Sequence, residues 1–429
     1  MKKVVWAVVL LTWLAGIAEA AETITVAEAR RMALAHNHDI KDLQENILRA
    51  EIAIQKAWAT LLPEIAVTGT VTRNNKAVSI PTGTGENRTI QELWNQSVGI
   101  GGDMILFSPS SIPLIMNAHE NADAVGTQSR HIEAELLHGV TSAYYAAAQA
   151  GKLVRVAEQA LSRSHEQVKH AQARFNVGQG IRLDVVRAEL EVAKSEKTLR
   201  ESENARDQAL QALGFLIGKS DGAFAVTPPE EDPKIPTGSV DQLIKDALGK
   251  RFDLKATRMN DEIARRAELQ AYLSFLPVFS LQSSYDWNSA GGFSGENTSW
   301  NVMFIGRWPL FDRSLTIAQV RENRSLARTA ANAQSRLAEQ IDNGIRQEYL
   351  KLTQAETSLV AAKKEAELAQ QTYDMVAQQF AVGLVDNLAM IDASTALVQV
   401  EQELAQQELA LKLAILSLRH ASGLYLTVE

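Results

Sequence analysis

The feature that most limits the fold of this chain is an apolar residue at every seventh position over two long stretches. One stretch runs from Ile345 to Phe380 and the other from Val140 to Phe175. Many of these apolar residues have an alanine three positions later in the chain. This spacing averages 3.5 residues, which is the period of a coiled-coil seam. We therefore expect two long helices, from about Pro113 to Phe175 and from about Arg313 to Phe380.

Each predicted long helix would measure on the order of 100 Å at 1.5 Å per residue. A globular domain rarely holds such a helix, so the spacing favours a rod or a tube. A shorter helix with the same period follows each long one, as in Met390 to Leu418. The turns between them contain Gly178 and Gly383, and glycine readily adopts the left-handed conformation that ends a helix. We interpret these turns as the tips of helical hairpins.

The chain also repeats itself. Thr25–Lys41 aligns with Ser239–Lys255 at an offset of 214 residues, and the segments that begin at Tyr144 and Tyr349 align at an offset of 205. The order predicted for each repeat is helix, two strands, long helix and shorter helix. The first helices are expected at Val26 to about Leu61 and at Val240 to about Ser274. The predicted parts are the first repeat at 21–218, a proline-rich connector at 219–238, and the second repeat at 239–429.

Two segments in each repeat alternate between apolar and polar residues, which is the pattern of a β-strand with two different faces. The four predicted strands are about 64–73, 94–107, 278–288 and 299–311. Each is roughly ten residues long, the length that crosses a bilayer. Tryptophans gather in them, as in the aromatic girdle of a membrane barrel; they are Trp94, Trp287, Trp300 and Trp308. A soluble β-sandwich with one polar face is the alternative.

Four strands are too few for a closed membrane barrel, which needs about eight. An open sheet edge in lipid leaves backbone groups without hydrogen-bond partners. Two chains would supply eight strands, and such a barrel is filled by its own side chains. Three chains would supply twelve and leave a lumen, which suits the small polar residues Asn95, Ser97, Gly99 and Gly101. We therefore expect a homotrimer in contact with membrane lipid.

The beginning of the chain indicates export. Two lysines precede an apolar run that ends in Ala18-Glu19-Ala20, which predicts a secretory signal peptide at residues 1–20. The chain contains no cysteine, so we expect neither disulfides nor a lipid anchor. No later stretch is long and apolar enough for a membrane helix. The net charge of −8 argues against a nucleic-acid partner.

No sequence motif for chemistry is present. We find no nucleophile, zinc or phosphate-loop motif, and the eight histidines are scattered along the chain. The Gly178-Gln179-Gly180 segment is a turn, because no strand precedes it. We therefore expect no enzyme activity, no cofactor and no metal.

The order and duplication of these elements are similar to those of the TolC-like outer membrane efflux protein family, also called outer-membrane factors. The segments that carry the resemblance are Ile24–Ala29 with Asn37–Ile40, Leu62-Pro63, Arg174–Gly178 and Phe380–Leu384. The resemblance covers nearly all of the chain after residue 20. It implies a mixed α/β membrane protein, in which a trimeric 12-stranded β-barrel in the outer membrane continues into a long periplasmic α-helical barrel. An equatorial belt would comprise 214–238 and 424–429.

The resemblance implies a function as well. Such a protein is the outer-membrane channel of a tripartite efflux system, a passive conduit for substrates expelled by an inner-membrane pump of the RND type or the ABC type. A periplasmic adaptor protein would connect the two. A duct for type I protein secretion would have the same sequence features. A secreted coiled-coil scaffold or pore-forming protein is the alternative from a different class.

By alignment with the family, Asp184 and Asp392 are candidates for the acidic ring that constricts the channel, although either acid also suits the first turns of a helix. Family members often carry a further acid where this chain has Ala389, so a weaker block by cations is expected. Arg182 and Asp386 are candidates for closing ion pairs. The residues expected to dock the adaptor are Val177 and Gly178 in one tip and Val382, Gly383 and Leu384 in the other. The first tip departs from the family motif after Gly178.

Overall fold

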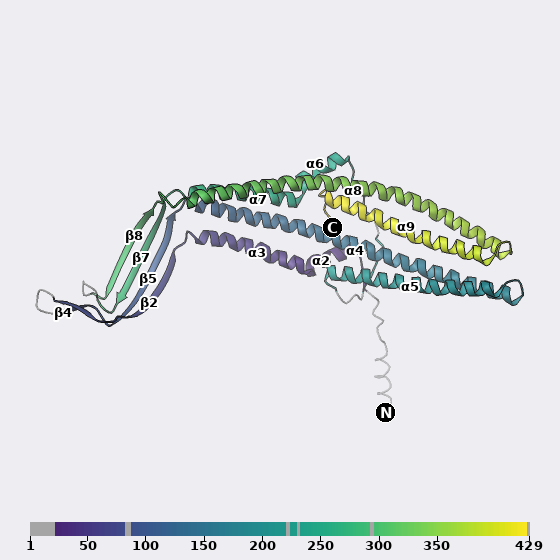
Figure 1. Cartoon of the computed structure of the whole chain (residues 1–429), viewed down its shortest axis with the longest axis horizontal. Helices are drawn as coiled ribbons and strands as arrows, with labels where there is room; N and C mark the ends of the chain where they lie inside the picture. Colours follow the sequence, from purple (N-terminus) through teal and green to yellow (C-terminus); the bar gives the residue numbers. More distant parts are fainter. Residues whose placement is uncertain (1–21, 82–86, 220–223, 230–231, 292–295, 427–429) are drawn as a thin grey trace, which may run out of the picture. The chain divides into compact units, whose positions relative to one another are not determined.

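The computed structural model describes residues 22–81, 87–219, 224–229, 232–291 and 296–426 (Figure 1). The predicted signal peptide lies outside these residues, as do residues 427–429 of the predicted belt. Helices make up most of the described chain. In chain order, the elements are β1 (Glu22–Ile24), α2 (Val26–His36), α3 (His38–Ala59), β2 (Glu64–Arg73), β3 (Val78–Pro81), β4 (Asn87–Gln91), β5 (Trp94–Phe107), α4 (Ser111–Asn176), α5 (Arg182–Ile217), β6 (Phe224–Val226), α6 (Val240–Lys250), α7 (Phe252–Leu273), β7 (Val278–Asn288), β8 (Thr298–Arg307), α8 (Leu315–Ala381) and α9 (Asn387–Ala421).

The contacts within the chain define two compact units. Unit 1 comprises Met1–Leu43, Arg130–Arg251 and Ala338–Glu429, and it contains the two helical tips. Unit 2 comprises Gln44–Ser129 and Phe252–Leu337, and it contains the four-stranded sheet. Each unit is therefore built from both halves of the chain.

The helix predicted at the start of each repeat is in fact two helices, so this expectation is wrong. Asn37 separates α2 from α3, and Arg251 separates α6 from α7; both have an extended backbone with ψ near 130°. The Asn37 side chain accepts a hydrogen bond of 2.8 Å from the Asp39 amide, which starts a new helix in place of continuing the old one. Its Nδ2 atom donates to the carbonyl oxygen of Leu216. Arg251 makes the corresponding bond to Ala421.

Part of the proline-rich connector predicted at 219–238 forms strand β6. The Phe224-Ala225-Val226 segment pairs in parallel with β1. The pair covers a core of unit 1 that contains Val140, Tyr144 and Leu213. The Tyr144 hydroxyl lies 2.9 Å from the carbonyl oxygen of Ile24 and 2.7 Å from that of Thr227. An apolar tripeptide without proline can therefore form a strand here, because the core below buries its side chains.

The seven-residue spacing marks the buried stripe of the long helices. On α8, Ile345 and Leu352 are buried, as are Ala355 and Ala362, which belong to the set of alanines three positions after the seven-residue repeat. On α4 the stripe includes Val140, Ala147 and Val154, which are buried as well. Among the described residues, no helix contains an apolar segment that would let it cross a membrane.

The four-stranded sheet of unit 2 is antiparallel, with the order β2-β5-β7-β8. Val67 pairs with Ile100, Ile100 with Tyr285, and Tyr285 with Trp300. Residues that pair directly across antiparallel strands point to the same face, so this register puts apolar residues of all four strands on one face. The sequence did not predict the short hairpin of β3 and β4, which lies between β2 and β5 in the chain.

Candidate functional site

Both helical tips of unit 1 are built by the same backbone motif. Gly178 has φ of +73° and Gly383 has φ of +79°. After α4, the amides of Gly178 and Gln179 donate to the carbonyl oxygens of Phe175 and Arg174. After α8, the amides of Gly383 and Leu384 donate to the carbonyl oxygens of Phe380 and Gln379. These pairs of bonds form a Schellman motif, in which a residue without a Cβ atom ends the helix.

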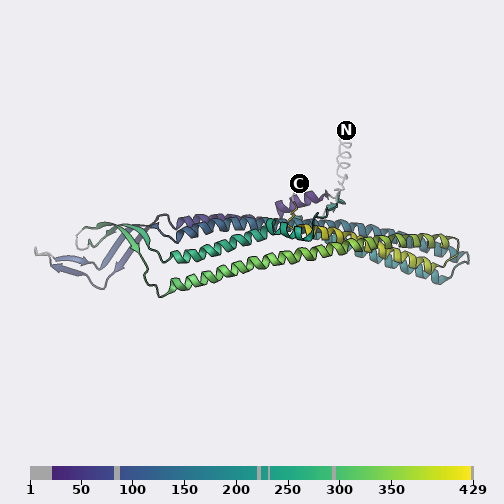
Figure 2. The same cartoon turned by 90° about the horizontal axis from the view of Figure 1, so that it is seen from above.

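The structure brings the two tips together. The Nδ2 atom of Asn387, in the first turn of α9, donates a hydrogen bond of 3.0 Å to the carbonyl oxygen of Asp184, in the first turn of α5. The turns after α4 and α8 lie at the same end of unit 1 in both views (Figure 1 and Figure 2). A cavity of about 310 Å³ between them is lined by Arg174, Asp184 and Asp386, together with Gly383 and Leu384.

The four acidic and basic candidates for the constriction have different surroundings. Asp184 is half-buried beside Asn387, whereas Arg182 and Asp392 are exposed and do not line this cavity. Asp386 caps α9, because its side chain accepts a hydrogen bond of 2.9 Å from the Ala389 amide. Within the described chain, Asp386 and Arg182 form no ion pair with each other. Their role in closing ion pairs stays a prediction.

The predicted docking residues form an exposed apolar surface at the tips. Val177, Val382 and Leu384 are each about 70% exposed or more. Ile181, which precedes α5, is exposed as well. Exposed aliphatic side chains grouped at one end of a polar helical hairpin are typical of a surface that a partner covers.

Further contacts between the two halves of the chain were not predicted. Arg163 of α4 and Glu401 of α9 form an ion pair of 2.8 Å, and both side chains are largely buried. Lys152 and Glu408 form a second pair along the same two helices. The Arg163 guanidinium also lies over the ring of Tyr373. Burial raises the pKa of the Tyr373 hydroxyl, and nearby Arg163 lowers it in part. Charged residues are frequent on all these helices, so no pattern in the sequence marks these particular pairs.

The two faces of the sheet differ in polarity. The apolar face is exposed in the single chain, and its residues are Ile65, Val67, Val71, Trp94, Val98, Ile100, Tyr285, Trp287, Trp300, Val302 and Phe304. The opposite face carries Thr70, Ser97, Gly99, Ser284, Asp286 and Asn301. Hydrogen bonds connect the polar face across strands, as in Asn301 to Ser284. Strands with one apolar and one polar face suit a barrel wall between lipid and water.

The tryptophans occupy two levels of the sheet. Trp94, Trp287 and Trp300 lie toward the strand ends that are farther from the helices, and Arg73 stacks over Trp94. Trp308 directly follows β8, and its Nε1 atom donates to the carbonyl oxygen of Phe275. Trp308 lies eight positions after Trp300, or about 26 Å at 3.3 Å per residue. The apolar band of a membrane barrel is about 25 Å tall.

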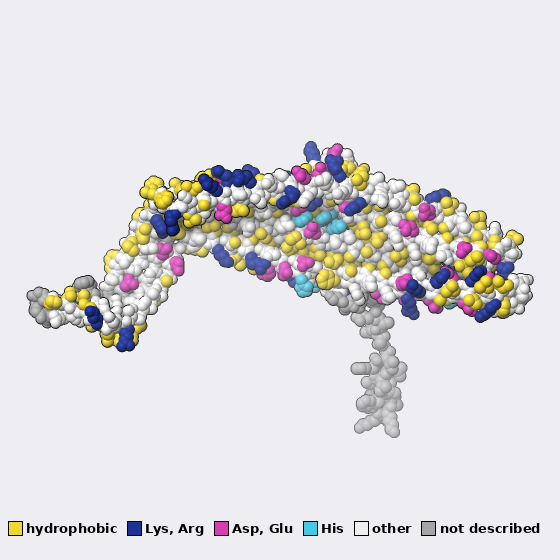
Figure 3. Space-filling view, viewed as in Figure 1, with side chains coloured by type: hydrophobic (Ala, Val, Ile, Leu, Met, Phe, Trp, Pro, Cys, Tyr) yellow, Lys and Arg dark blue, Asp and Glu magenta, His cyan; other side chains and the backbone are white. Residues whose placement is uncertain are grey.

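Three histidines, two on α4 and one on α9, lie close together in unit 1. The rings of His138 and His420 are 4.8 Å apart, and that of His131 is 6.3 Å from His420. Figure 3 shows histidine side chains grouped near the C-terminal end of α9. Burial lowers the pKa of His138, although Glu135 and Glu348 oppose the effect. The described residues include no set of three or more His, Cys, Asp or Glu side chains arranged to bind a metal ion.

Comparison with known proteins gives consistent matches. A family model described as "Outer membrane efflux protein" matches residues 29–219 and 243–424. Outer membrane efflux protein BepC of Brucella suis biovar 1 (strain 1330) is 24% identical over 437 residues, which cover 98% of this chain and 90% of that protein. Outer membrane protein TolC of Vibrio cholerae serotype O1 is 24% identical over 391 residues, covering 86% of this chain and 84% of that one.

Solved structures share the fold. A membrane protein from Pseudomonas aeruginosa superposes with a TM-score of 0.79 at 18% identity, over 93% of each chain. The outer membrane protein VceC from Vibrio cholerae gives a TM-score of 0.78 at 17% identity, over 93% of this chain and 96% of that one. At such identities, the superpositions carry information about the fold alone.

Proposed function

Because the chain belongs to the outer membrane efflux protein family, we propose that it is the exit duct of a tripartite efflux system. It is an outer-membrane protein of the Gram-negative envelope that extends into the periplasm. The family consists of channel proteins, and we propose that this chain likewise catalyses no reaction. In this proposal it is a passive conduit, and an inner-membrane pump supplies the energy.

The amphipathic sheet is the observation that carries this proposal. In the described chain, β2 and β8 each pair on one side only, so the sheet has two open edges. Unpaired backbone groups in lipid cost several kcal/mol each, which favours edge-to-edge pairing of β2 with β8 of another protomer. Three protomers would form a 12-stranded barrel with Trp94, Trp287, Trp300 and Trp308 at its lipid boundaries and the polar face toward the lumen.

The helices support assembly into a trimer as well. On α8, Leu350 and Val360 are exposed in the single chain, as is Phe215 near the end of α5. Large apolar side chains in these positions would be covered by neighbouring helices in a barrel made of three chains. We further propose that residues 21–218 and 239–429 are two copies of one structural repeat, because α3 and α7 lie 214 positions apart and both long helices end in the same turn motif.

The tips would have two roles in the assembled channel. The exposed residues Val177, Val382 and Leu384 would dock a periplasmic adaptor, together with Gly178 and Gly383. Asp184 and Asp392, brought together from three protomers, would form the acidic constriction, and Arg182 and Asp386 would contribute at its rim. Carboxylates that converge on a narrow pore attract cations and limit the current.

Single-channel conductance in planar bilayers tests the duct and its constriction. The detergent-extracted protein is expected to insert and to carry small, cation-sensitive currents. The double variant Asp184→Ala/Asp392→Ala should carry larger currents that cations block less. The variant Glu201→Ala/Glu403→Ala removes the same charge from exposed positions elsewhere on α5 and α9 and should behave as wild type. If the Asp184 and Asp392 variant matches wild type, the constriction lies elsewhere.

Failure of the protein to insert under any condition would contradict the duct itself. A secreted coiled-coil scaffold or a pore-forming toxin would be recovered from the periplasm or the medium, without a heat-modifiable trimer in outer-membrane extracts. A duct for type I protein secretion would pass the conductance test. Its inner-membrane partner is an ABC transporter, so pull-down of a proton-driven pump would favour efflux over type I secretion.

A further inference from the structure

The two hairpins of the unit 2 sheet have the same register. In the first, β2 pairs with β5 over ten residues, starting with Glu64 opposite Asp103. In the second, β7 pairs with β8 over ten residues, starting with Val278 opposite Arg307. Val278 lies 214 positions after Glu64, and Arg307 lies 204 positions after Asp103. The hairpins are therefore equivalent residue by residue, so that each contact of one has a defined counterpart in the other.

Strand β5 continues beyond its pairing with β2. Its last partner in β2 is Glu64, opposite Asp103, yet β5 extends four residues further, to Phe107, along its other neighbour β7. Phe107 lies opposite Phe279 of β7, and the two rings stack with their centres 6.4 Å apart. The extension of β5 is thus formed against a strand of the second hairpin.

Strand β8 ends at the equivalent point and has no such extension. Arg307 is its last paired residue, and no described strand lies along its outer edge. The next four residues correspond to the extension of β5, with Phe311 in the position of Phe107. Leu310 and Phe311 are 82% and 81% exposed, and Figure 3 shows hydrophobic side chains at the surface where the sheet meets the helices. This apolar segment is therefore left uncovered in the single chain.

The outer edge of β2 is the counterpart of the edge that β7 offers to β5. Ile65 lies 214 positions before Phe279 and is 71% exposed on the apolar face of the sheet. Because β2 and β8 lie at opposite edges of the sheet, and four strands are too few to close a barrel, one chain cannot pair its own two edges. A second copy of the chain remains as the source of the strand beside β8.

We propose that β2 of a second copy pairs with β8 in the register that β7 has with β5, and that residues 308–311 become part of the strand on assembly. Phe311 would then lie opposite Ile65 of the next copy. Pro309 takes the position of Ile105, which adjoins the bulge of β5, and a strand tolerates proline at a bulge. Each copy offers β2 to one neighbour and β8 to the other, a head-to-tail contact that can close into a ring.

This inference rests on the proposed trimer and goes beyond it, because it fixes which residues face each other between copies. Cross-linking in outer-membrane extracts tests the register. The chain has no cysteine, so an introduced pair reports only the intended contact. Directly opposed residues of antiparallel strands have Cα atoms about 4.5–5.5 Å apart, within disulfide range. A residue two positions further along lies about 7–8 Å away.

Phe311→Cys/Ile65→Cys should therefore form covalent dimers and trimers on oxidation. Phe311→Cys/Val67→Cys, which is shifted by two positions on the same face, should form several-fold less, and Phe311→Cys alone should form none. Equal or stronger linkage of the shifted pair would overturn the register while leaving the trimer intact. So would the absence of linkage in both pairs when the heat-modifiable trimer still forms. A wild-type protein that forms no trimer would overturn both the register and the proposed duct.

A comparison of two adjacent residues tests the contact without cysteines. Leu310 corresponds to Leu106, which lies at the bulge and has no partner among the described residues of β7. Leu310 and Phe311 are equally exposed in the single chain, so the chain alone gives no reason for a difference between them. Phe311→Ala should lower the temperature at which the trimer dissociates in SDS by about 5 °C or more, and Leu310→Ala should lower it little. Equal effects would mean that lipid, and not a second copy, covers this segment.

Discussion

Asn387 and Asp184 are 203 positions apart in the chain, and the side-chain amide of the first donates a hydrogen bond of 3.0 Å to the backbone carbonyl oxygen of the second. Asn387 is buried, and the bond joins the start of α9 to the start of α5. We predict that Asn387→Ala loosens the contact between the tips, destabilises it by about 1 kcal/mol and raises the mean single-channel current. Asn323→Ala is the control, because Asn323 bonds only within its own helix. Equal currents in the two variants would contradict the prediction.

The role of Asp386 can be separated into cap and charge. Asp386→Asn keeps a side-chain oxygen that can accept from the Ala389 amide, whereas Asp386→Ala removes it. If the cap is the main role, the Ala variant loses about 1 kcal/mol of stability and the Asn variant nearly none. If the charge closes the channel, the Asn variant alters the current as much as Arg182→Gln does. Thermal unfolding and conductance of the same four proteins, wild type included, measure both quantities.

The polar face of the sheet depends on the missing side chain of Gly99. A Cβ atom at this position would lie 2.2 Å from Oδ1 of Asp286, whose Oδ2 atom accepts a hydrogen bond from the Ser284 hydroxyl. We predict that Gly99→Ala displaces the Asp286 carboxylate and breaks its hydrogen bond with Ser284. This should destabilise the sheet by about 0.5–1.5 kcal/mol and lower the yield of heat-modifiable trimer in outer-membrane extracts. Gly69→Ala, where no atom lies within 4 Å of the added Cβ, should not. Adding Asp286→Ser should restore the yield of Gly99→Ala; a failure to do so would place the clash elsewhere.

Periodicity in the sequence was sufficient to locate the four strands of the unit 2 sheet and the two long helices. Apolar residues that recur at every second position predicted β2, β5, β7 and β8, and those that recur every 3.5 residues on average predicted α4 and α8. Both patterns show which face of a strand or helix carries the apolar side chains. Local chemistry predicted the tips, since Gly178 and Gly383 are required where φ is positive. The same approach missed the break at Asn37, where a side chain that caps α3 ended α2 early.

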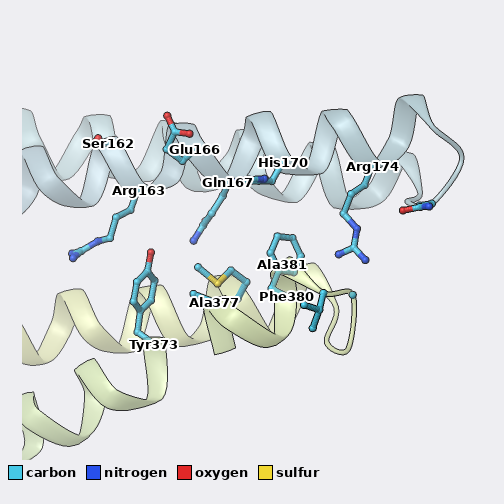
Figure 4. Close-up of a pocket in the computed structure, with 14 residues that line it drawn as sticks. Ser162, Arg163, Glu166, Gln167, His170, Arg174, Tyr373, Ala377, Phe380 and Ala381 are labelled. Carbon is cyan, nitrogen blue, oxygen red and sulfur yellow. The ribbon is translucent and has the colours of Figure 1, made fainter. Parts of the chain in front are cut away.

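Residues that align between the two repeats are not equally buried in the structure. Tyr144 and Tyr349 align, but Tyr144 is fully buried by β1 and β6, whereas Tyr349 is exposed because the connector covers only the first of the two positions. Phe175 and Phe380 differ in the opposite sense, because Phe175 is exposed and Phe380 is buried against α4 (Figure 4). Contacts such as Arg163 with Glu401 depend on which helices become neighbours, and residue spacing within one helix carries no information about that.

The histidine cluster predicts a dependence of stability on pH. Burial lowers the pKa of His138 below its ordinary value, against the opposing effect of Glu135 and Glu348. The rings of His131 and His420 lie beside it on α4 and α9. Because the unfolded chain then binds a proton more readily than the folded one, stability is complete above the ordinary histidine pKa of about 6.5. It is lost as the pH falls from there through the lower pKa of the folded state.

Other carboxylates also titrate in acid, so the comparison must be between variants. We predict that the thermal unfolding midpoint of the wild-type protein falls between about pH 7.5 and 5.5, and that His138→Gln reduces this fall. His165→Gln, at an exposed position of α4, should leave the fall unchanged. Parallel curves for wild type and His138→Gln would mean that protonation of His138 is no less favourable in the folded chain than in the unfolded one. In that case Glu135 and Glu348 compensate fully for its burial, and Glu135→Gln would then make the loss of stability in acid steeper.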